Sequence, residues 1–152
     1  MTVAFSTSQV VSLVISGPIT ATGTVSVVGI TPNSDHSYLH TAGEVIAKGS
    51  LVCKSETDAN ILLASNVDWT RMPAFGVTAE AGIKGQEIQV VHFGKVDDIQ
   101  RDADFDYDDL VFVGVDGKAT NVAPSTIVQS IGRAKNASDV ILLINQTAVE
   151  ID

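Results

Sequence analysis

The segment with the most obvious chemical potential is an acidic run between positions 97 and 109, which contains seven Asp residues. From 102 to 108 an Asp stands at every second position, so an extended chain would place these carboxylates on one face. Such oxygen clusters suit Ca²⁺, but an EF-hand loop requires Gly and Glu where this chain has Tyr107 and Val113. We therefore predict a solvated edge strand whose charges prevent pairing with other chains. A bound divalent cation is the alternative.

The three histidines, His36, His40 and His92, are the next candidates for metal binding. His36 and His40 are four residues apart, which on a helix would bring both imidazoles to one face. Pro32 and Asn33 precede them in a polar, turn-rich stretch, so we predict a loop and no zinc site. We assign no metal ligands and no cofactor.

A catalytic nucleophile is equally hard to find. The single cysteine, Cys53, lies in an apolar stretch and is predicted to be a small buried hydrophobic residue. No serine stands in a G-x-S-x-G frame, and no Gly-rich phosphate loop precedes a helical pattern. We assign no catalytic and no cofactor-binding residues, and we predict that the protein is not an enzyme.

Composition and charge limit the partners further. The 152 residues are 45% apolar and only 18% charged, with a formal net charge of −9. This acidity makes nucleic acid and anionic membrane surfaces poor partners, and no apolar run of membrane-spanning length is present. A single cysteine excludes an internal disulfide framework, which is typical of folding in a reducing cytoplasm.

Short β-branched segments bounded by glycine turns must position whatever surface the protein uses. They predict an all-β fold, a sandwich or small barrel. Residues 42–94 resemble residues 110–146 with offsets of 59, 56 and 52 residues, which predicts two approximately repeated β-units. Chance similarity among Val- and Gly-rich strands is the alternative. In this repeat Gly76 and Gly132 are equivalent, and each lies inside a strand.

The core of residues 42–152 is preceded by residues 1–41, which we predict to be an N-terminal arm and β-hairpin. Residues 1–8 are rich in Ser and Thr and are assigned to the arm. Residues 9–30 contain two Val-rich stretches separated by glycine and proline, which predicts the hairpin. Residues 31–41 are polar and are assigned to a loop.

Four stretches carry a resemblance to a known family: residues 43–52 (GEVIAKGSLV), 73–96 (PAFGVTAEAGIKGQEIQVVHFGKV), 109–120 (DLVFVGVDGKAT) and 128–134 (VQSIGRA). Together they resemble the small capsid decoration, or cement, proteins of tailed bacteriophages and related β-rich virion accessory proteins. The resemblance lies in glycine and apolar positions. It implies a homotrimer on the capsid surface of the virion, made in the bacterial host cytoplasm, which binds the major capsid protein and stabilises the capsid.

The contact with the capsid should come from low-charge segments, because these can pack against another β-rich surface at little desolvation cost. This nominates Val3, Phe5, Trp69, Met72 and Phe75 as contact residues.

Two other classes compete with a capsid protein. A tail or fibre β-module that binds a host-surface receptor would use aromatic side chains as anchors, namely Tyr38, Trp69, Phe105 and Tyr107. A trimeric β-fold enzyme is disfavoured by the missing catalytic set.

Overall fold

The computed structural model describes residues 2–6, 10–14 and 37–151, and the chain divides into two compact units, residues 1–31 and 32–152. In the smaller unit, β1 (Thr2–Ser6) pairs with β2 (Val10–Val14) as an antiparallel hairpin. Residues 1–8, predicted as an arm, thus contain a strand, because the alternation of apolar and small polar residues outweighs the Ser/Thr-rich composition. The second strand predicted within residues 9–30 lies outside the described residues.

Five antiparallel strands form the first sheet of the larger unit, in the order β3-β7-β6-β4-β5. The predicted loop over residues 31–41 is wrong from Ser37 onward, because pairing with β7 makes this polar stretch an edge strand. The strands are β3 (Ser37–Thr41), β4 (Leu51–Lys54), β5 (Ile61–Leu63), β6 (Ala74–Thr78) and β7 (Glu87–Val91).

A second five-stranded antiparallel sheet has the order β10-β9-β12-β13-β8. Its strands are β8 (Phe93–Val96), β9 (Leu110–Val113), β10 (Ala119–Thr120), β12 (Ser130–Ala134) and β13 (Val140–Leu143). Two short strands, β11 (Ile127–Val128) and β14 (Val149–Glu150), pair with each other. Within the described residues, helix is limited to the 3-10 turn η2 (Trp69–Arg71), so the predicted all-β fold is confirmed.

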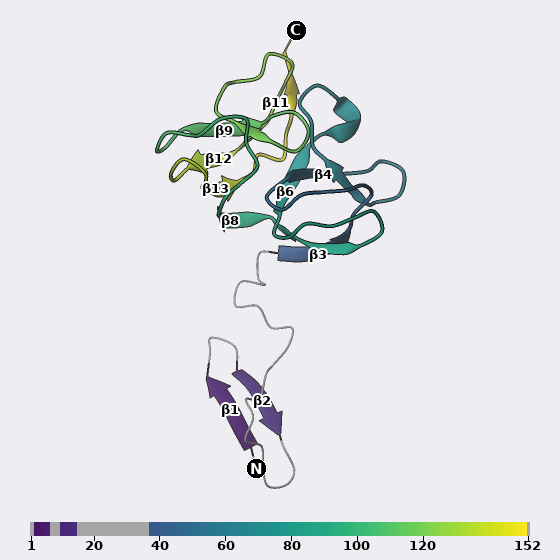
Figure 1. Cartoon of the computed structure of the whole chain (residues 1–152), viewed down its shortest axis with the longest axis vertical. Coiled ribbons are helices and arrows are strands. Elements are labelled where there is room, and N and C mark those ends of the chain that lie inside the picture. The colour runs from purple at the N-terminus through teal and green to yellow at the C-terminus, as the bar shows by residue number, and fades with distance from the viewer. Residues whose placement is uncertain (1, 7–9, 15–36, 152) are drawn as a thin grey trace. The chain divides into compact units, whose positions relative to one another are not determined.

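The two sheets have the same strand order. Strands β3, β7, β6, β4 and β5 of the first sheet correspond in turn to β8, β13, β12, β9 and β10 of the second. Figure 1 shows the second sheet beside the first within the larger unit. The predicted repeat is therefore confirmed, and each copy includes one earlier strand, β3 or β8. Residues 86–94 (QEIQVVHFG) have the pattern of one long strand, but they are divided between the sheets, since β7 ends at Val91 in one sheet and β8 begins at Phe93 in the other.

The equivalence extends to a bulge beside the predicted glycine pair. Val52 of β4 faces Gly76 and Val111 of β9 faces Gly132, and in both pairs the register shifts by one residue directly before the glycine. A Cβ on Gly76 would lie 2.4 Å from Val90 Cγ1, and a Cβ on Gly132 would lie 2.0 Å from the Ile141 carbonyl oxygen. Both positions thus need glycine because a neighbouring strand passes too close.

The sheets pack together through a shared core, but they present opposite faces to it. In the first sheet Leu51 and Val77 point into the shared core, whereas Val52 points to a smaller second core on the other face. In the second sheet it is Val111, the counterpart of Val52, that points into the shared core. The face of the second sheet that carries Leu110 is left exposed, and we call it the outer face.

The Asp-rich segment 97–109 is a covering loop, and the edge strand predicted for it is not formed. Ile99 and Phe105 are buried in the shared core and anchor the loop over the second sheet. Their burial outweighs the alternation of acidic residues, most of whose side chains are exposed at the surface.

Candidate interaction surface

The outer face of the second sheet carries the largest described group of exposed apolar side chains on neighbouring strands. Cross-strand pairing places Leu110, Arg133, Ile141 and Lys95 in one row over β9, β12, β13 and β8. Leu143 pairs with Phe93 in the adjacent row. The exposed fractions are 43% for Leu110, 41% for Ile141, 70% for Leu143 and 51% for Phe93.

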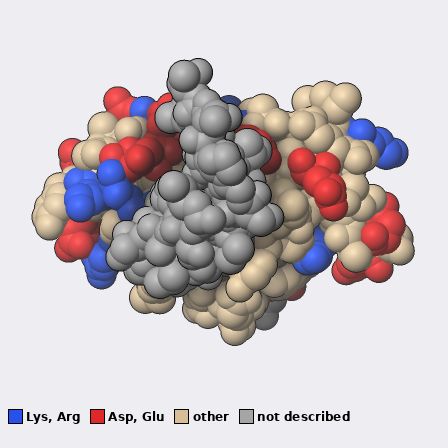
Figure 2. All heavy atoms as spheres, turned by 90° about the horizontal axis from the view of Figure 1, so that it is seen from below, with Lys and Arg blue, Asp and Glu red and all other residues tan. Residues whose placement is uncertain are grey.

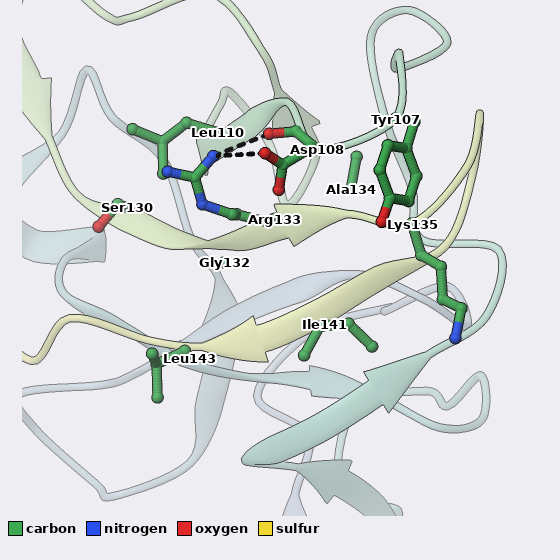
Figure 3. Close-up of a pocket in the computed structure, with 10 residues that line it drawn as sticks. All are labelled: Tyr107, Asp108, Leu110, Ser130, Gly132, Arg133, Ala134, Lys135, Ile141 and Leu143. Atoms are coloured by element: carbon green, nitrogen blue, oxygen red, sulfur yellow. Dashed lines mark hydrogen bonds and ion pairs between the residues drawn. The ribbon is translucent and has the colours of Figure 1, made fainter.

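A hollow of about 500 Å³ lies in this face, centred on Gly132. Figure 3 shows Leu110 and Ser130 at one side of Gly132, Ile141 and Leu143 on the neighbouring strand, and Tyr107 toward the end of the sheet. Gly132 lines the hollow between the larger side chains of Leu110 on β9 and of Ile141 and Leu143 on β13. Its floor and walls are mainly apolar, which suits an inserted chain segment better than a charged small molecule.

Cations border the hollow. Arg133 donates to the Asp108 carbonyl oxygen at 2.9 Å, and its Nη1 is 3.5 Å from the Asp108 carboxylate. Lys135 lines the hollow, and Lys95 pairs with Asp97 at 2.6 Å. Figure 2 shows charged side chains of both signs next to each other at the left of the molecule, on the side where Figure 1 places the second sheet. Arg133 and Lys95 can thus exchange the carboxylates they pair with now for carboxylates of a partner.

Trp69, a predicted contact residue, is held at the surface by a built turn. Asp68 caps η2 by accepting from the Thr70 N–H at 2.9 Å. The guanidinium of Arg71 makes two contacts with the Glu44 carboxylate, at 2.6 and 3.2 Å, which tie the turn to the first sheet. Burial alone would raise the pKa of Glu44, but hydrogen bonds from Arg71 and from the Leu63 N–H lower it. Trp69 is 41% exposed on this support.

The other predicted contact residues are scattered. Met72 is only 8% exposed and packs in the shared core, so it is not available at the surface. Phe75 is half-buried beside the second core. Val3 and Phe5 belong to β1 in the smaller unit. The structure thus brings none of them together with Trp69 in one described patch.

A histidine pair was missed by sequence reasoning. The Nε2 atoms of His40, in β3, and His92 are 3.3 Å apart, and both rings contact Phe75. Burial lowers the pKa of both imidazoles, and the nearby Lys54 ammonium lowers each further. Both rings are therefore favoured in the neutral form near pH 7. The two residues are 52 positions apart, so only the pairing of β3 with β7 reveals the pair.

The acidic segment makes local ion pairs. Arg101 lies 3.2 Å from Asp98 and 2.7 Å from Asp104, and Asp109 accepts from the Asn121 amide at 2.7 Å. Among the described residues, no group of three His, Cys, Asp or Glu side chains is arranged to hold a metal ion. Phe105, a candidate receptor contact, is buried and unavailable to a partner.

Cys53 is buried, as predicted, and its burial raises the pKa of the thiol to about 11. The thiol is therefore protonated and poorly reactive at neutral pH. None of the described residues belongs to a helix long and apolar enough to cross a membrane.

Comparison with known proteins shows a likeness in fold to a solved structure. No family model and no curated protein sequence matches the chain. Among solved structures, the chain is similar to the head fiber gp8.5 N base of bacteriophage phi29, with a TM-score of 0.50 and 21% sequence identity. The similarity covers 75% of this chain and 97% of the phi29 chain. At this identity the likeness establishes a shared fold.

Proposed function

We propose that this chain is a structural protein of a tailed-bacteriophage virion, bound to the head, where it decorates and stabilises the capsid. The observation that carries the proposal is the fold shared with nearly the whole phi29 head fiber base. The sequence resemblance of residues 42–146 to capsid decoration proteins supports the same class. The role is mechanical, and it requires no catalytic step and no cofactor.

The partners in this proposal are the major capsid protein and further copies of the chain. A homotrimer on the capsid surface would present the same low-charge segments several times to a repeating lattice, so weak contacts would add up. The protein would be made in the host cytoplasm and would then bind the assembled head.

Two low-charge regions are the proposed capsid contacts. Residues 1–34 contain no Asp, Glu, Lys or Arg, although charged residues make up 18% of the whole chain. This segment contains Val3 and Phe5. The second region is the turn that presents Trp69, a residue type that often dominates binding energy. Residues 1–34 can be desolvated without breaking ion pairs, and the ion pair beside Trp69, Arg71 with Glu44, is made within the chain.

Particles assembled with and without the protein test this proposal. We expect particles that lack it to form but to lose their contents at a lower temperature, and added protein to restore the original value. The Trp69→Ala variant should bind fewer copies per particle. Asp104→Ala, which removes an exposed carboxylate outside both regions, should bind like the unchanged protein. Equal binding by both variants would remove Trp69 from the contact.

A tail or fibre module that binds a host receptor is the second candidate, favoured by exposed aromatic side chains. Tyr38 and Tyr107 are 61% and 80% exposed, and Tyr38 stacks edge-on with His92. Such rings suit a glycan or protein receptor. This function requires a location at the tail or at a fibre tip, with tens of copies at most, whereas head decoration requires hundreds. Copy number in purified particles therefore separates the two.

A further inference from the structure

The two sheets provide an internal template for an unassigned interface. In the first sheet, the face that carries Leu51 and Val77 is buried against the second repeat. The equivalent residues of the second sheet, Leu110 and Arg133, lie on the outer face and are exposed. The outer face therefore has the geometry to bind a repeat of the same fold, as its counterpart in the first sheet does.

The internal contact identifies what covers this face. The tip of the β9–β10 hairpin reaches the start of β4, where the Leu51 N–H donates to the Gly117 carbonyl oxygen at 2.8 Å. The Gly117 N–H in turn donates to the Ala64 carbonyl oxygen at 2.7 Å. The first sheet is thus closed at this point by a hairpin tip that belongs to the other repeat.

The counterpart of that hairpin in the first repeat is the β4–β5 hairpin, and its tip, residues 55–60, is largely exposed. Ala59 stands two residues before β5 with a φ of 60°, as Gly117 stands two residues before β10 with a φ of 76°. The two tips therefore share a backbone feature that non-glycine residues rarely adopt. In the second sheet, the place equivalent to the start of β4 is Leu110, at the wall of the hollow.

We propose that the outer face of the second sheet binds the first repeat of a second copy of this chain, with the β4–β5 hairpin tip of that copy seated in the hollow over Gly132. Charge supports this occupant. The tip carries the exposed carboxylates of Glu56 and Asp58, and Arg133 and Lys135 border the hollow. The contact joins unlike surfaces, so it is head-to-tail and closes into a ring if the rotation between copies allows it.

This inference deepens the oligomer part of the proposed function, and it is tested on the purified full chain without any particle. If the interface test fails, the proposed location on the head still stands. If the protein is absent from particles, the proposed interface still stands. The size of the protein is measured by light scattering over a range of concentrations. We expect an oligomer whose dissociation constant rises at least about tenfold for Leu143→Asp, because a buried charge would face apolar side chains.

The matched control is Val122→Asp, which changes an equally exposed apolar residue that lies in neither the hollow nor the first repeat. It should leave the dissociation constant unchanged. A charge exchange provides a second test that does not depend on folding of an apolar-to-acidic variant. Arg133→Glu should weaken association with the unchanged chain, and mixing it with Glu56→Arg should restore it. A monomer at all concentrations, or equal effects of Leu143→Asp and Val122→Asp, would overturn the proposal.

Crosslinking decides the orientation of the contact. Leu143→Cys and Glu56→Cys variants are mixed and treated with a short thiol crosslinker, while the natural Cys53 stays unreactive because it is buried and its pKa is raised. We expect a crosslink between the two different variants. A crosslink between two Leu143→Cys chains would indicate a symmetric face-to-face dimer and would overturn the head-to-tail contact.

Discussion

The two repeats share strand order, bulge and glycine, yet they differ in which face of the sheet is buried. In the first sheet, Val77 lies on the face that enters the shared core, whereas the equivalent residue of the second sheet is Arg133, at the surface. Strand order and bulge therefore do not determine which face of a sheet is buried. That face is determined by which alternate positions along each strand carry apolar side chains. A repeated fold can in this way keep one face for its own core and leave another for assembly.

A second difference lies at the junction between the sheets. The first repeat carries the His40–His92 pair beside β3, whereas residues 93–146, which form the second repeat, contain no histidine. A titratable imidazole pair is thus present in one copy and missing from the other. The first sheet should depend on pH at a place where the second sheet does not.

The largest expected effect on stability comes from adding one methyl group at Gly132 or at its equivalent, Gly76. Gly132→Ala should destabilise the protein by about 3–5 kcal/mol, because its Cβ would overlap a backbone carbonyl that cannot move aside. Gly76→Ala should cost less, about 2–3 kcal/mol, because the first atom it meets belongs to the Val90 side chain. Urea unfolding measures both. Gly85→Ala, with open space around it, is the control and should cost about 1 kcal/mol through its positive φ. Equal costs at all three positions would refute the close approach.

A buried amide that has no counterpart in the first repeat connects the two repeats. Gln129 accepts from the Ala74 N–H at 2.8 Å and donates to the carbonyl oxygens of Ala74 and Asn145 at 2.8 and 2.7 Å. Gln129→Leu would leave these groups unpaired in the core, so we expect a loss of about 2–3 kcal/mol. Gln100→Leu is the control, since that side chain makes one exposed hydrogen bond. If Gln129→Leu leaves the unfolding free energy unchanged, the hydrogen bonds of this amide do not stabilise the junction between the repeats.

The histidine pair gives a smaller, pH-dependent difference. Since the pKa values of His40 and His92 are lowered in the folded protein, the unfolded chain binds protons more readily. Their contribution to stability is present above the unfolded pKa of about 6.5 and is lost as the pH falls below it. Hydrogen exchange at pH 5 should show faster opening of β3 than at pH 7, relative to β8. His92→Asn should remove most of this difference, and an unchanged pH response in that variant would assign it to other groups.

The smallest expected effect is on the turn that presents Trp69. Trp69→Ala should change the unfolding free energy by less than about 1 kcal/mol, because the side chain is partly exposed and contributes little to the core. Met72→Ala, three residues away but buried, should cost about 2–4 kcal/mol. Similar losses for the two variants would mean that Trp69 is a core residue and a poor candidate for a contact.

Much of the fold could be predicted because glycine turns and β-branched runs act locally. The strand around Leu51, the strand around Leu110 and the Asp116–Gly117 turn all follow from short-range pattern. The division between β7 and β8 could not be predicted, since one continuous alternating stretch serves two sheets. Polar β3 became a strand only through its partner, and Phe105 entered the core despite its acidic neighbours.

The candidate site was harder to predict than the fold. The outer face is assembled from β8, β9, β12 and β13, and each strand has the same alternating pattern whichever side is covered. Trp69 was found because an aromatic residue in a loop stands out in the sequence. The hollow over Gly132 and the histidine pair depend on strand pairing between distant segments, which local pattern does not report.

Imaging of purified particles by electron cryomicroscopy, with the described fold fitted into the density, tests the proposed function most directly. We expect density for this β-fold on the outer surface of the head, repeated over the capsid lattice and lost from particles that lack the protein. Density confined to the tail, or particles from which the protein is absent, would contradict a head-bound structural role.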